Sequence, residues 1–288
     1  MNPIDLEMLH VQRISTASHL RTLRQDWNRL AGDSPFARWD WLANWWDAYS
    51  DDGDLFVLEA RTNQGQLVAV APFYRETSLF EGRVLRLLGS GDACTGAQSL
   101  LVDPSFSTAS ARAFSLWLIA CSPTRQHGWD DLDLETVSPG DEATRLFARQ
   151  MVRRGAGLTR RKADPAWTVV LPESWDEMQS SVSAGMRRKL RLLSRRYVET
   201  DRATFKIAQT QEQAQSMLSR MIDLHQERWN QRGELGYFAS EEYTRFLKSV
   251  VADSHHEQQL RLCQVDLDQR PVAVGCLVNR GQNYTMYQ

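Results

Sequence analysis

The chain has 288 residues, a length that predicts two domains of ordinary size. Hydrophobic residues make up 42% of it and charged residues 24%, which excludes a disordered or fibrous protein. The formal net charge of −2 gives no overall reason to expect nucleic acid or an anionic membrane as a partner. No run approaches the eighteen or so apolar residues of a membrane helix, and the first eleven residues lack a signal-peptide layout, so we expect a cytoplasmic protein.

The four cysteines are widely separated, at positions 94, 121, 263 and 276, without CxxC or histidine-paired spacing. This spacing favours free thiols in a reducing compartment over a disulfide framework. The same spacing indicates no zinc site, so we expect no bound metal.

The first half alternates helical and strand patterns. Apolar residues at three- and four-residue spacing predict helices over 20–30, 41–49, 107–120 and 141–152. Alternating or β-branched runs predict strands over 9–14, 55–60, 67–74, 84–88, 99–102, 132–134 and 167–171. Such an order predicts a mixed sheet flanked by helices, of the α+β or α/β class. The loop Gly89-Ser90-Gly91-Asp92 resembles a phosphate-binding loop, but no helix start follows it directly.

The last thirty residues predict an antiparallel meander of three strands. Its strands are Leu260–Val265, Val272–Val278 and Tyr284–Gln288, and its first turn carries Asp268 and Gln269. Helices over 217–229 and 243–251 precede the meander. We expect the third strand to form an edge without a further partner.

The second half repeats features of the first. Trp27-Asn28 followed by Phe36-Ala37 recurs 202 residues later as Trp229-Asn230 followed by Phe238-Ala239. Two strands recur as well, at offsets of about 204 residues, so we infer an internal duplication. The alternative is two unrelated units, each made of amphipathic helices and a hairpin.

A strongly basic segment precedes the helices of the second half. Residues 185–197 contain six basic residues and no acidic one, with an apolar stripe formed by Met186, Leu190, Leu193 and Tyr197. One interpretation is a solvated face balanced by acidic residues elsewhere. The other is a surface for phosphate groups, because guanidinium groups bind phosphate oxygens in a bidentate manner.

The residues in the second half resemble a known family. Four stretches are similar to the GNAT-type acyltransferase domain of CelD-like proteins. They are Arg187-Arg188-Lys189-Leu190, Leu224 to Trp229, Leu260-Arg261-Leu262 and Pro271-Val272-Ala273. That group is associated with bacterial cellulose or exopolysaccharide biosynthesis. The stretches 41–49 and 67–72 resemble the first domain of such proteins, and the tandem arrangement is similar to that of the FemABX peptidyltransferases.

The resemblance implies two tandem GNAT-like domains, residues 1–171 and 172–288. It also implies transfer of an acyl group from acetyl-CoA, or a related thioester, to a small-molecule or nucleotide-linked sugar, with proteins of polysaccharide biosynthesis as partners. In GNAT domains the thioester lies against the fourth strand, and amides of the following glycine-containing loop hold the pyrophosphate. The segment Val102–Ala113 of the first copy has no glycine, and the fourth strand of the second copy is expected at Asn283–Gln288, where the sequence ends. We therefore expect an incomplete second domain without a recognisable CoA loop.

Direct transfer requires a base, a proton donor and phosphate contacts. The candidate bases are Glu227 and His225, although His225 lies on an apolar stripe that also suits a core histidine. The candidate proton donors are Tyr284 and Tyr287, and the candidate phosphate contacts are Arg187, Arg188, Arg191 and Arg228. Two alternatives remain open: a non-catalytic protein that holds a polyanionic or nucleotide-linked ligand on its basic helix, and transfer from aminoacyl-tRNA. The net charge disfavours nucleic acid.

Overall fold

The structure is a computed structural model that describes residues 8–93, 95–122, 127–138, 140–161, 167, 169–254, 260–280 and 283–288. Its contacts divide the chain into two units. The first contains Met1–Ala163 together with Ser240–Val250, and the second contains Asp164–Ala239 together with Val251–Gln288. The domain boundary expected between residues 171 and 172 stays a prediction.

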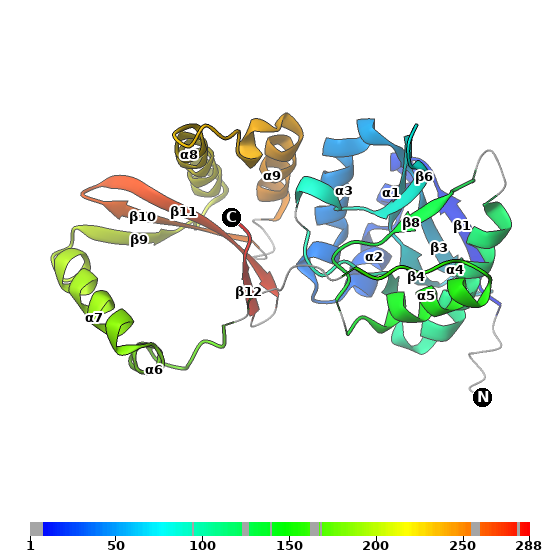
Figure 1. The fold of residues 1–288 in the computed structure, drawn as a ribbon, viewed down its shortest axis with the longest axis horizontal. Coiled ribbons are helices and arrows are strands. Elements are labelled where there is room, and N and C mark those ends of the chain that lie inside the picture. Colours follow the sequence, from blue (N-terminus) through cyan, green and yellow to red (C-terminus); the bar gives the residue numbers. More distant parts are fainter. Residues whose placement is uncertain are drawn as a thin grey trace. The chain divides into compact units, whose positions relative to one another are not determined.

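A long bent hairpin is the frame of the first unit (Figure 1). One arm is β2 (Asp54–Leu55) and β3 (Val57–Arg61), and the other is β4 (Leu67–Ala71) and β5 (Phe73–Ser78). The Phe56 amide donates to the Phe73 carbonyl at 3.1 Å, so the arms stay paired where the strands are interrupted. Pro72, which lacks an N–H donor, lies at the interruption of the second arm.

Four further strands extend this hairpin. β1 (His10–Ile14) pairs antiparallel with β3, and β7 (Leu101–Val102) pairs antiparallel with β4. β6 (Gly82–Leu87) pairs antiparallel with β5, and β8 (Asp131–Asp133) lies parallel to β6. The two four-stranded orders, β1-β3-β4-β7 and β2-β5-β6-β8, therefore share one hairpin and make a mixed sheet.

Helices α4 (Ser107–Cys121) and α5 (Glu142–Arg153) pack on one face of this sheet. The buried cluster there joins strand residues to Phe114 of α4 and Phe147 of α5, both no more than 1% exposed. At about 25 cal/mol per Å² of buried apolar surface, side chains of this size each contribute a few kcal/mol to folding. The strand members of the cluster are Phe56, Leu58, Ala60, Ala69, Ala71, Phe73, Leu85 and Leu87.

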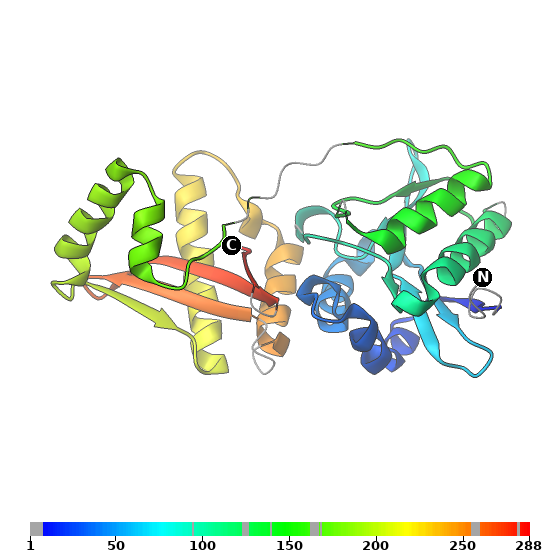
Figure 2. The same ribbon diagram turned by 90° about the horizontal axis from the view of Figure 1, so that it is seen from below.

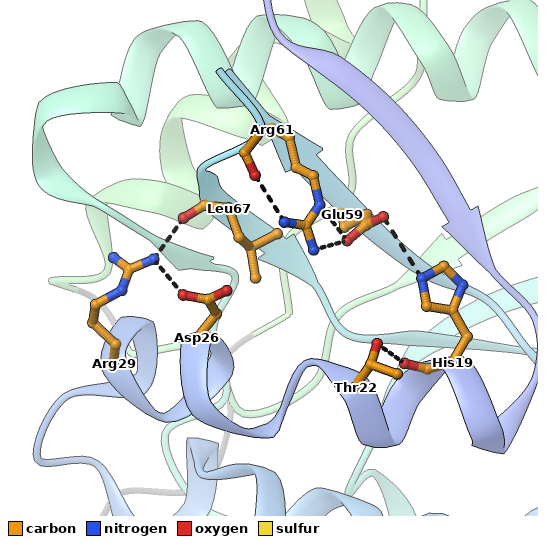
Figure 3. Close-up of polar contacts among 8 residues, drawn as sticks. His19, Thr22, Asp26, Arg29, Glu59, Arg61 and Leu67 are labelled. Atoms are coloured by element: carbon orange, nitrogen blue, oxygen red, sulfur yellow. Dashed lines mark hydrogen bonds and ion pairs between the residues drawn. The ribbon is translucent and has the colours of Figure 1, made fainter. Parts of the chain in front are cut away.

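Helices α1 (Ala17–Thr22) and α2 (Arg24–Ala31) take the other face, where polar groups tie them to β3 and β4 (Figure 3). The Glu59 carboxylate, buried in β3, accepts from Arg61 Nε and Nη2 at 3.0 and 2.8 Å and lies 3.9 Å from His19 of α1. Arg29 of α2 donates to the Leu67 carbonyl at 2.7 Å. Each of these polar groups therefore has a partner, as burial requires.

Aromatic packing holds α3 (Trp39–Tyr49) in the first unit. Trp41, Trp45 and Trp46 are all buried, so they belong to the core. The Trp41 ring makes edge-to-face contacts with Phe36, at 4.9 Å between centroids, and with Phe246 of α9 (Glu241–Ser254), at 5.1 Å. Residue 246 belongs to the segment Ser240–Val250, which is part of the first unit although it follows residue 239 of the second.

The second unit is built on an antiparallel sheet in the order β12-β11-β10-β9. Its strands are β9 (Ala203–Ile207), β10 (Leu260–Leu267), β11 (Arg270–Arg280) and β12 (Asn283–Met286). Helix α8 (Gln211–Asn230) lies on one side of the sheet, and α6 (Trp175–Ser181) and α7 (Ala184–Leu193) lie on the other (Figures 1 and 2). A short π-helix, η6 (Ser194–Val198), continues α7 toward β9.

The structure confirms the mixed α/β class and most predicted elements. Apart from the additional elements α1, η3 (Ser50–Asp52) and β2, the order β1-α2-η2-α3-β3-β4 of the first half recurs as β9-α8-η7-α9-β10-β11. The 3-10 turns η2 (Pro35–Ala37) and η7 (Tyr237–Ala239) stand at equivalent places. This order supports the inferred duplication. The strand predicted over 167–171 is wrong: residues 167 and 169–171 lie outside any strand, and Val170 is 90% exposed. An apolar run forms a strand only where a neighbouring edge supplies hydrogen bonds.

A glycine in the loop after β6 is required by close packing. Gly89 has φ +90°, and a Cβ there would lie 2.8 Å from Thr95 Oγ1 and 3.1 Å from Leu42 Cδ2. Gly65 has a similar φ of +85° but open space around it. We predict that Gly65→Ala lowers the free energy of unfolding by about 1 kcal/mol, from backbone strain alone. Gly89→Ala should cost about 2 kcal/mol more, because its Cβ also overpacks the site. Urea unfolding of both variants measures this difference, and equal losses would contradict it.

An ion pair anchors the turn after β5. Arg83 donates through its backbone N–H and its Nε to Asp130 Oδ2, both at 2.9 Å, and through Nη2 to Oδ1 at 2.7 Å. The side-chain hydrogen bonds from Arg83 are the largest cause that lowers the pKa of Asp130 to about 2. A carboxyl whose folded pKa is depressed stabilises the fold above its unfolded pKa, and this contribution is lost as the pH falls from about 4 to about 2.

We therefore predict that Asp130→Asn destabilises the protein at pH 7 and that the difference from the parent disappears near pH 2. Because about half of the Asp130 side chain is exposed, solvent screening limits the loss to about 1 kcal/mol. Glu135→Gln is the matched control, since Glu135 is exposed and has no ion pair among the described side chains. Urea unfolding at several pH values measures both variants. A loss for Asp130→Asn that does not change with pH would count against the ion pair.

Candidate functional site

Strand alternation gives the β9–β12 sheet two unlike faces. One face packs on α8: Leu262 opposes Cys276 and Leu260 opposes Val278, and all four residues are buried. Buried residues of α8, among them Met217 and Leu218, lie against this face. Thr210 caps the helix by accepting from the Gln213 N–H at 3.3 Å.

The opposite face, here called the open face, carries apolar side chains that are partly exposed. Phe205 of β9 is 65% exposed and Met286 of β12 is 67% exposed. Between them, Cys263 of β10 opposes Gly275 of β11 and is only partly buried. A Cβ on Gly275 would meet its nearest atom, Met286 Sδ, at 3.5 Å, so the absent side chain leaves the β11–β12 region shallow. An exposed apolar face of this kind marks a binding surface more often than a solvated one.

Three polar groups meet on the open face near the β11–β12 pairing. The Arg261 guanidinium lies over the Tyr284 ring, 5.4 Å from its centroid. Tyr284 opposes Asn279, whose Oδ1 atom is buried and has no hydrogen-bond donor among the described residues. The face therefore offers a hydroxyl donor and a cation beside an apolar surface, with a buried acceptor next to them. Sequence reasoning did not single out Arg261 or Asn279, because only the strand register places them beside Tyr284.

The end of the chain forms a β-bulge against β11. The Cys276 N–H donates to the Gln288 carbonyl and the Tyr287 N–H donates to the Cys276 carbonyl, both at 2.8 Å, so two residues oppose one. Because Cys276 faces α8, this pairing places Tyr287 on the α8 side of the sheet. The two tyrosines predicted as proton donors therefore lie on different faces, and Tyr284 alone lies with Arg261.

The other predicted chemical residues lie on α8. His225 packs in the corner between α8 and η7, with its ring 4.9 Å from Phe238 and its Nδ1 3.1 Å from Gln226 Oε1. Glu227 is exposed and accepts from Gln231 Nε2 at 3.4 Å, and Arg228 is exposed beside it. The structure does not bring these three residues together with Tyr284: they belong to the helix on the covered face (Figures 1 and 2).

The predicted phosphate contacts on α7 are not equivalent. Arg187 donates through Nη2 to the carbonyls of Ser180 and Val182 at 3.4 and 3.2 Å, which holds the end of α6. Arg188 and Arg191 are exposed, and neither has a carboxylate partner among the described residues. Arg228 lies on the other side of the sheet from α7, so the four arginines do not form one cluster.

The glycine loop of the first unit follows β6, the strand that pairs in parallel with β8. Its Ser90 hydroxyl is buried and donates to the Leu87 carbonyl at 2.7 Å, and Gln98 Nε2 donates to the Leu88 carbonyl at 3.2 Å. A pocket of water-molecule size lies beside it, lined by Phe36, Ala37, Leu42, Pro72, Leu87, Leu88, Gln98 and Ser99. The carboxyl end of a parallel strand is a position where ligands bind in open sheets, but the polar side chains here satisfy one another.

Residues 184–288 match the family model described as an acetyltransferase (GNAT) domain. This part of the chain is therefore similar to GNAT acetyltransferase domains. The match begins at α7 and includes the whole β9–β12 sheet with α8, so the open face belongs to it. No curated protein matches the chain.

Two solved structures are similar to the chain at low identity. One is described as a possible acetyltransferase from Clostridium difficile 630, at 13% identity and a TM-score of 0.34, covering 57% of this chain and 100% of that one. The other is described as a GCN5-related glucosamine N-acetyltransferase region in a fungal multi-domain GH3 β-N-acetylglucosaminidase. It has 14% identity and a TM-score of 0.34, and covers 98% of this chain and 29% of that one. Because both TM-scores are below 0.5, neither similarity adds to what the family match indicates.

Two further observations concern the described residues alone. None of their helices is long and apolar enough to cross a membrane. They contain no group of three or more histidine, cysteine or acidic side chains placed to hold a metal ion.

Cys263 and Cys276 of the β9–β12 sheet lie on opposite faces, so their reactivity can show which face is accessible to solvent. Cys276, on the α8 side, is fully buried, and burial raises the pKa of its thiol to about 12. Cys263 is partly buried on the open face, and burial raises the pKa of its thiol to a smaller extent. Since the thiolate is the reactive form, we predict that a maleimide at pH 8 labels Cys263 in the native protein and Cys276 only after unfolding. Peptide mass spectrometry distinguishes the sites. Equal native labelling of both would show that the assignment of faces is wrong.

Proposed function

We propose that the chain is an acyltransferase that uses acetyl-CoA, or a related acyl-CoA, as co-substrate and binds its thioester on the open face beside β12. The observation that carries the proposal is the match of residues 184–288 to the GNAT domain. The apolar open face suits an acyl-pantetheine chain, and the donor of Tyr284 with the cation of Arg261 suits the reacting carbonyl and thiolate.

In the proposed reaction an amine or hydroxyl of the acceptor attacks the thioester carbonyl. A C–N or C–O bond forms, the C–S bond breaks, and the acyl group leaves CoA. The proton of the nucleophile passes to solvent, since the predicted bases Glu227 and His225 lie on α8 at the covered face. Tyr284 donates a proton to the departing thiolate. A covalent route through a cysteine is disfavoured, because burial raises the pKa of both thiols of the sheet.

The acceptor we propose is a sugar or nucleotide-linked sugar of bacterial polysaccharide or cell-envelope biosynthesis, in a cytoplasmic setting. Support for it comes from the similarity of residues 187–190, 224–229 and 260–262 to CelD-like proteins. Arg188 and Arg191 are the proposed contacts for phosphate groups of either substrate, since both are exposed and without carboxylate partners among the described residues. Proteins of polysaccharide biosynthesis are the proposed partners.

A second candidate function is a non-catalytic protein that holds a polyanionic or nucleotide-linked ligand on its basic helix. The observation that favours it is the set of exposed cations on α7 and η6 without ion-pair partners among the described residues. This candidate requires the α7 cations but no acyl-CoA on the open face. Acyl-CoA binding therefore separates the two candidates.

The test is calorimetric titration of the chain with acetyl-CoA, combined with maleimide labelling of Cys263. We expect binding at submillimolar concentration that protects Cys263. Release of free CoA thiol is then measured with amino sugars and nucleotide-linked amino sugars. With a working acceptor, Tyr284→Phe should lower kcat by about 10²-fold or more and leave acetyl-CoA affinity unchanged, because the hydroxyl acts in the transition state.

Tyr287→Phe is the matched control, because it removes the same hydroxyl from the α8 side of the sheet. Equal losses of kcat in the two variants would refute the role of Tyr284. The absence of acetyl-CoA binding at millimolar concentration would refute the acyltransferase proposal and favour the polyanion-binding protein.

A further inference from the structure

One side of α7 and η6 exposes apolar and basic side chains together. Met186, Lys189, Leu192, Leu193 and Arg196 follow the spacing of one helix face, here called the α7 surface. Leu192 is 64% exposed, Met186 48% and Leu193 40%. No residue of α6, α7 or η6 is buried, so this surface is not part of the core of the second unit.

The charge of this segment is uncompensated. Residues 178–198 contain no aspartate or glutamate. Among the described residues, none of the five exposed cations of α7 and η6 has a carboxylate within 4.0 Å; they are Arg188, Lys189, Arg191, Arg195 and Arg196. Arg202, which follows η6, is by contrast paired with Asp268 at 2.6 Å. The α7 segment therefore carries a local positive field that the net charge of the chain conceals.

The combination of exposed leucines and unpaired cations decides the kind of partner. A solvated basic helix gains nothing from Leu192, which lies between Lys189 and Arg196 on the helix surface and faces water. A nucleic-acid surface would be expected to interleave several exposed aromatic rings with the cations. The five residues of the α7 surface include none, and the Tyr197 ring, 5.2 Å from Arg196 Cζ, is itself half-buried. Apolar side chains flanked by lysine and arginine suit the boundary between lipid headgroups and acyl chains, where the leucines enter and the cations stay at the headgroups.

We propose that the α7 surface docks peripherally on a bilayer that contains anionic lipids. Leu192, Leu193 and Met186 enter the headgroup region, while Lys189 and Arg196 bind lipid phosphates and carboxylates. This inference does not depend on the acyltransferase proposal, because it uses the side of α7 away from Arg187 and Arg191 and requires no acyl-CoA.

The test is co-sedimentation of the full chain with vesicles of phosphatidylcholine in which phosphatidylserine is the minor, anionic component. Pure phosphatidylcholine vesicles are the comparison. We expect binding to the mixed vesicles only, weakened by added salt because screening shortens electrostatic attraction. Lys189→Glu combined with Arg196→Glu should lower the partition coefficient by at least about thirtyfold. Leu192→Ser should lower it by about tenfold, because one buried leucine is lost from the interface.

The matched control is Arg149→Glu combined with Arg153→Glu on α5, two exposed arginines of the first unit that give the same change in net charge. This pair should retain the vesicle binding of the parent. Circular dichroism checks that all variants keep the fold. Failure to sediment with the mixed vesicles overturns the proposal, as does an equal loss in the α5 pair. Binding that is unaffected by Leu192→Ser and is matched by soluble heparin overturns it too, in favour of a soluble polyanion.

Discussion

The pairing of β10 with β11 decides the properties of the second unit, because side chains alternate between two unlike faces. Leu262 opposite Cys276 points to α8, whereas Cys263 opposite Gly275 points to the open face. A register shift of one residue would exchange these faces and bury Arg261. The turn at Asp268 and Gln269, with φ values of +49° and +64°, fixes the register by joining Leu267 directly to Arg270.

A bulge lets this pairing accommodate a charge. The register shifts between Val265 and Asp266, and Asp266 is 3% exposed as a residue. Its carboxylate accepts from Lys206 Nζ and Gln264 Nε2, both at 2.6 Å. The hydrogen bond from Lys206 is the largest cause that lowers the pKa of Asp266. The paired charge links β9 to β10 at an edge where few apolar contacts are available, so it sustains the strand that sequence reasoning did not predict.

The same hairpin type has a different environment in the first unit. There β4, with the sequence Leu67-Val68-Ala69-Val70-Ala71, is buried along its whole length because helices cover both faces. β10 of the second unit alternates between buried and partly exposed residues instead. The continuous apolar run of β4 thus indicates a sheet buried on both faces, and the alternating run of β10 indicates a sheet buried on one face. The open face follows from the alternating pattern and not from any catalytic motif.

The sequence was sufficient to predict features that depend on local periodicity. The helices around Trp27, Trp41 and Trp229 and the terminal meander were recognisable because their side chains repeat with helix or strand spacing. β9 was missed because Ala203–Ile207 is short and exposed. The strand at 167–171 was wrong because an apolar run alone does not supply the hydrogen-bonding partner that a strand needs. The grouping of Arg261, Asn279 and Tyr284 depends on register between distant residues, which no local pattern contains.

The basic run of residues 185–197 also shows that a local sequence pattern cannot assign roles to single residues. All six cations of residues 185–197 look alike in the sequence, yet Arg187 bonds the last carbonyls of α6 and the other five face solvent. A cation at a helix C-terminus is stabilised by the helix dipole as well as by its hydrogen bonds. Arg187 thereby ties the first turns of α7 to the end of α6. Its charge serves the fold, whereas its five basic neighbours are exposed and available to the proposed ligands.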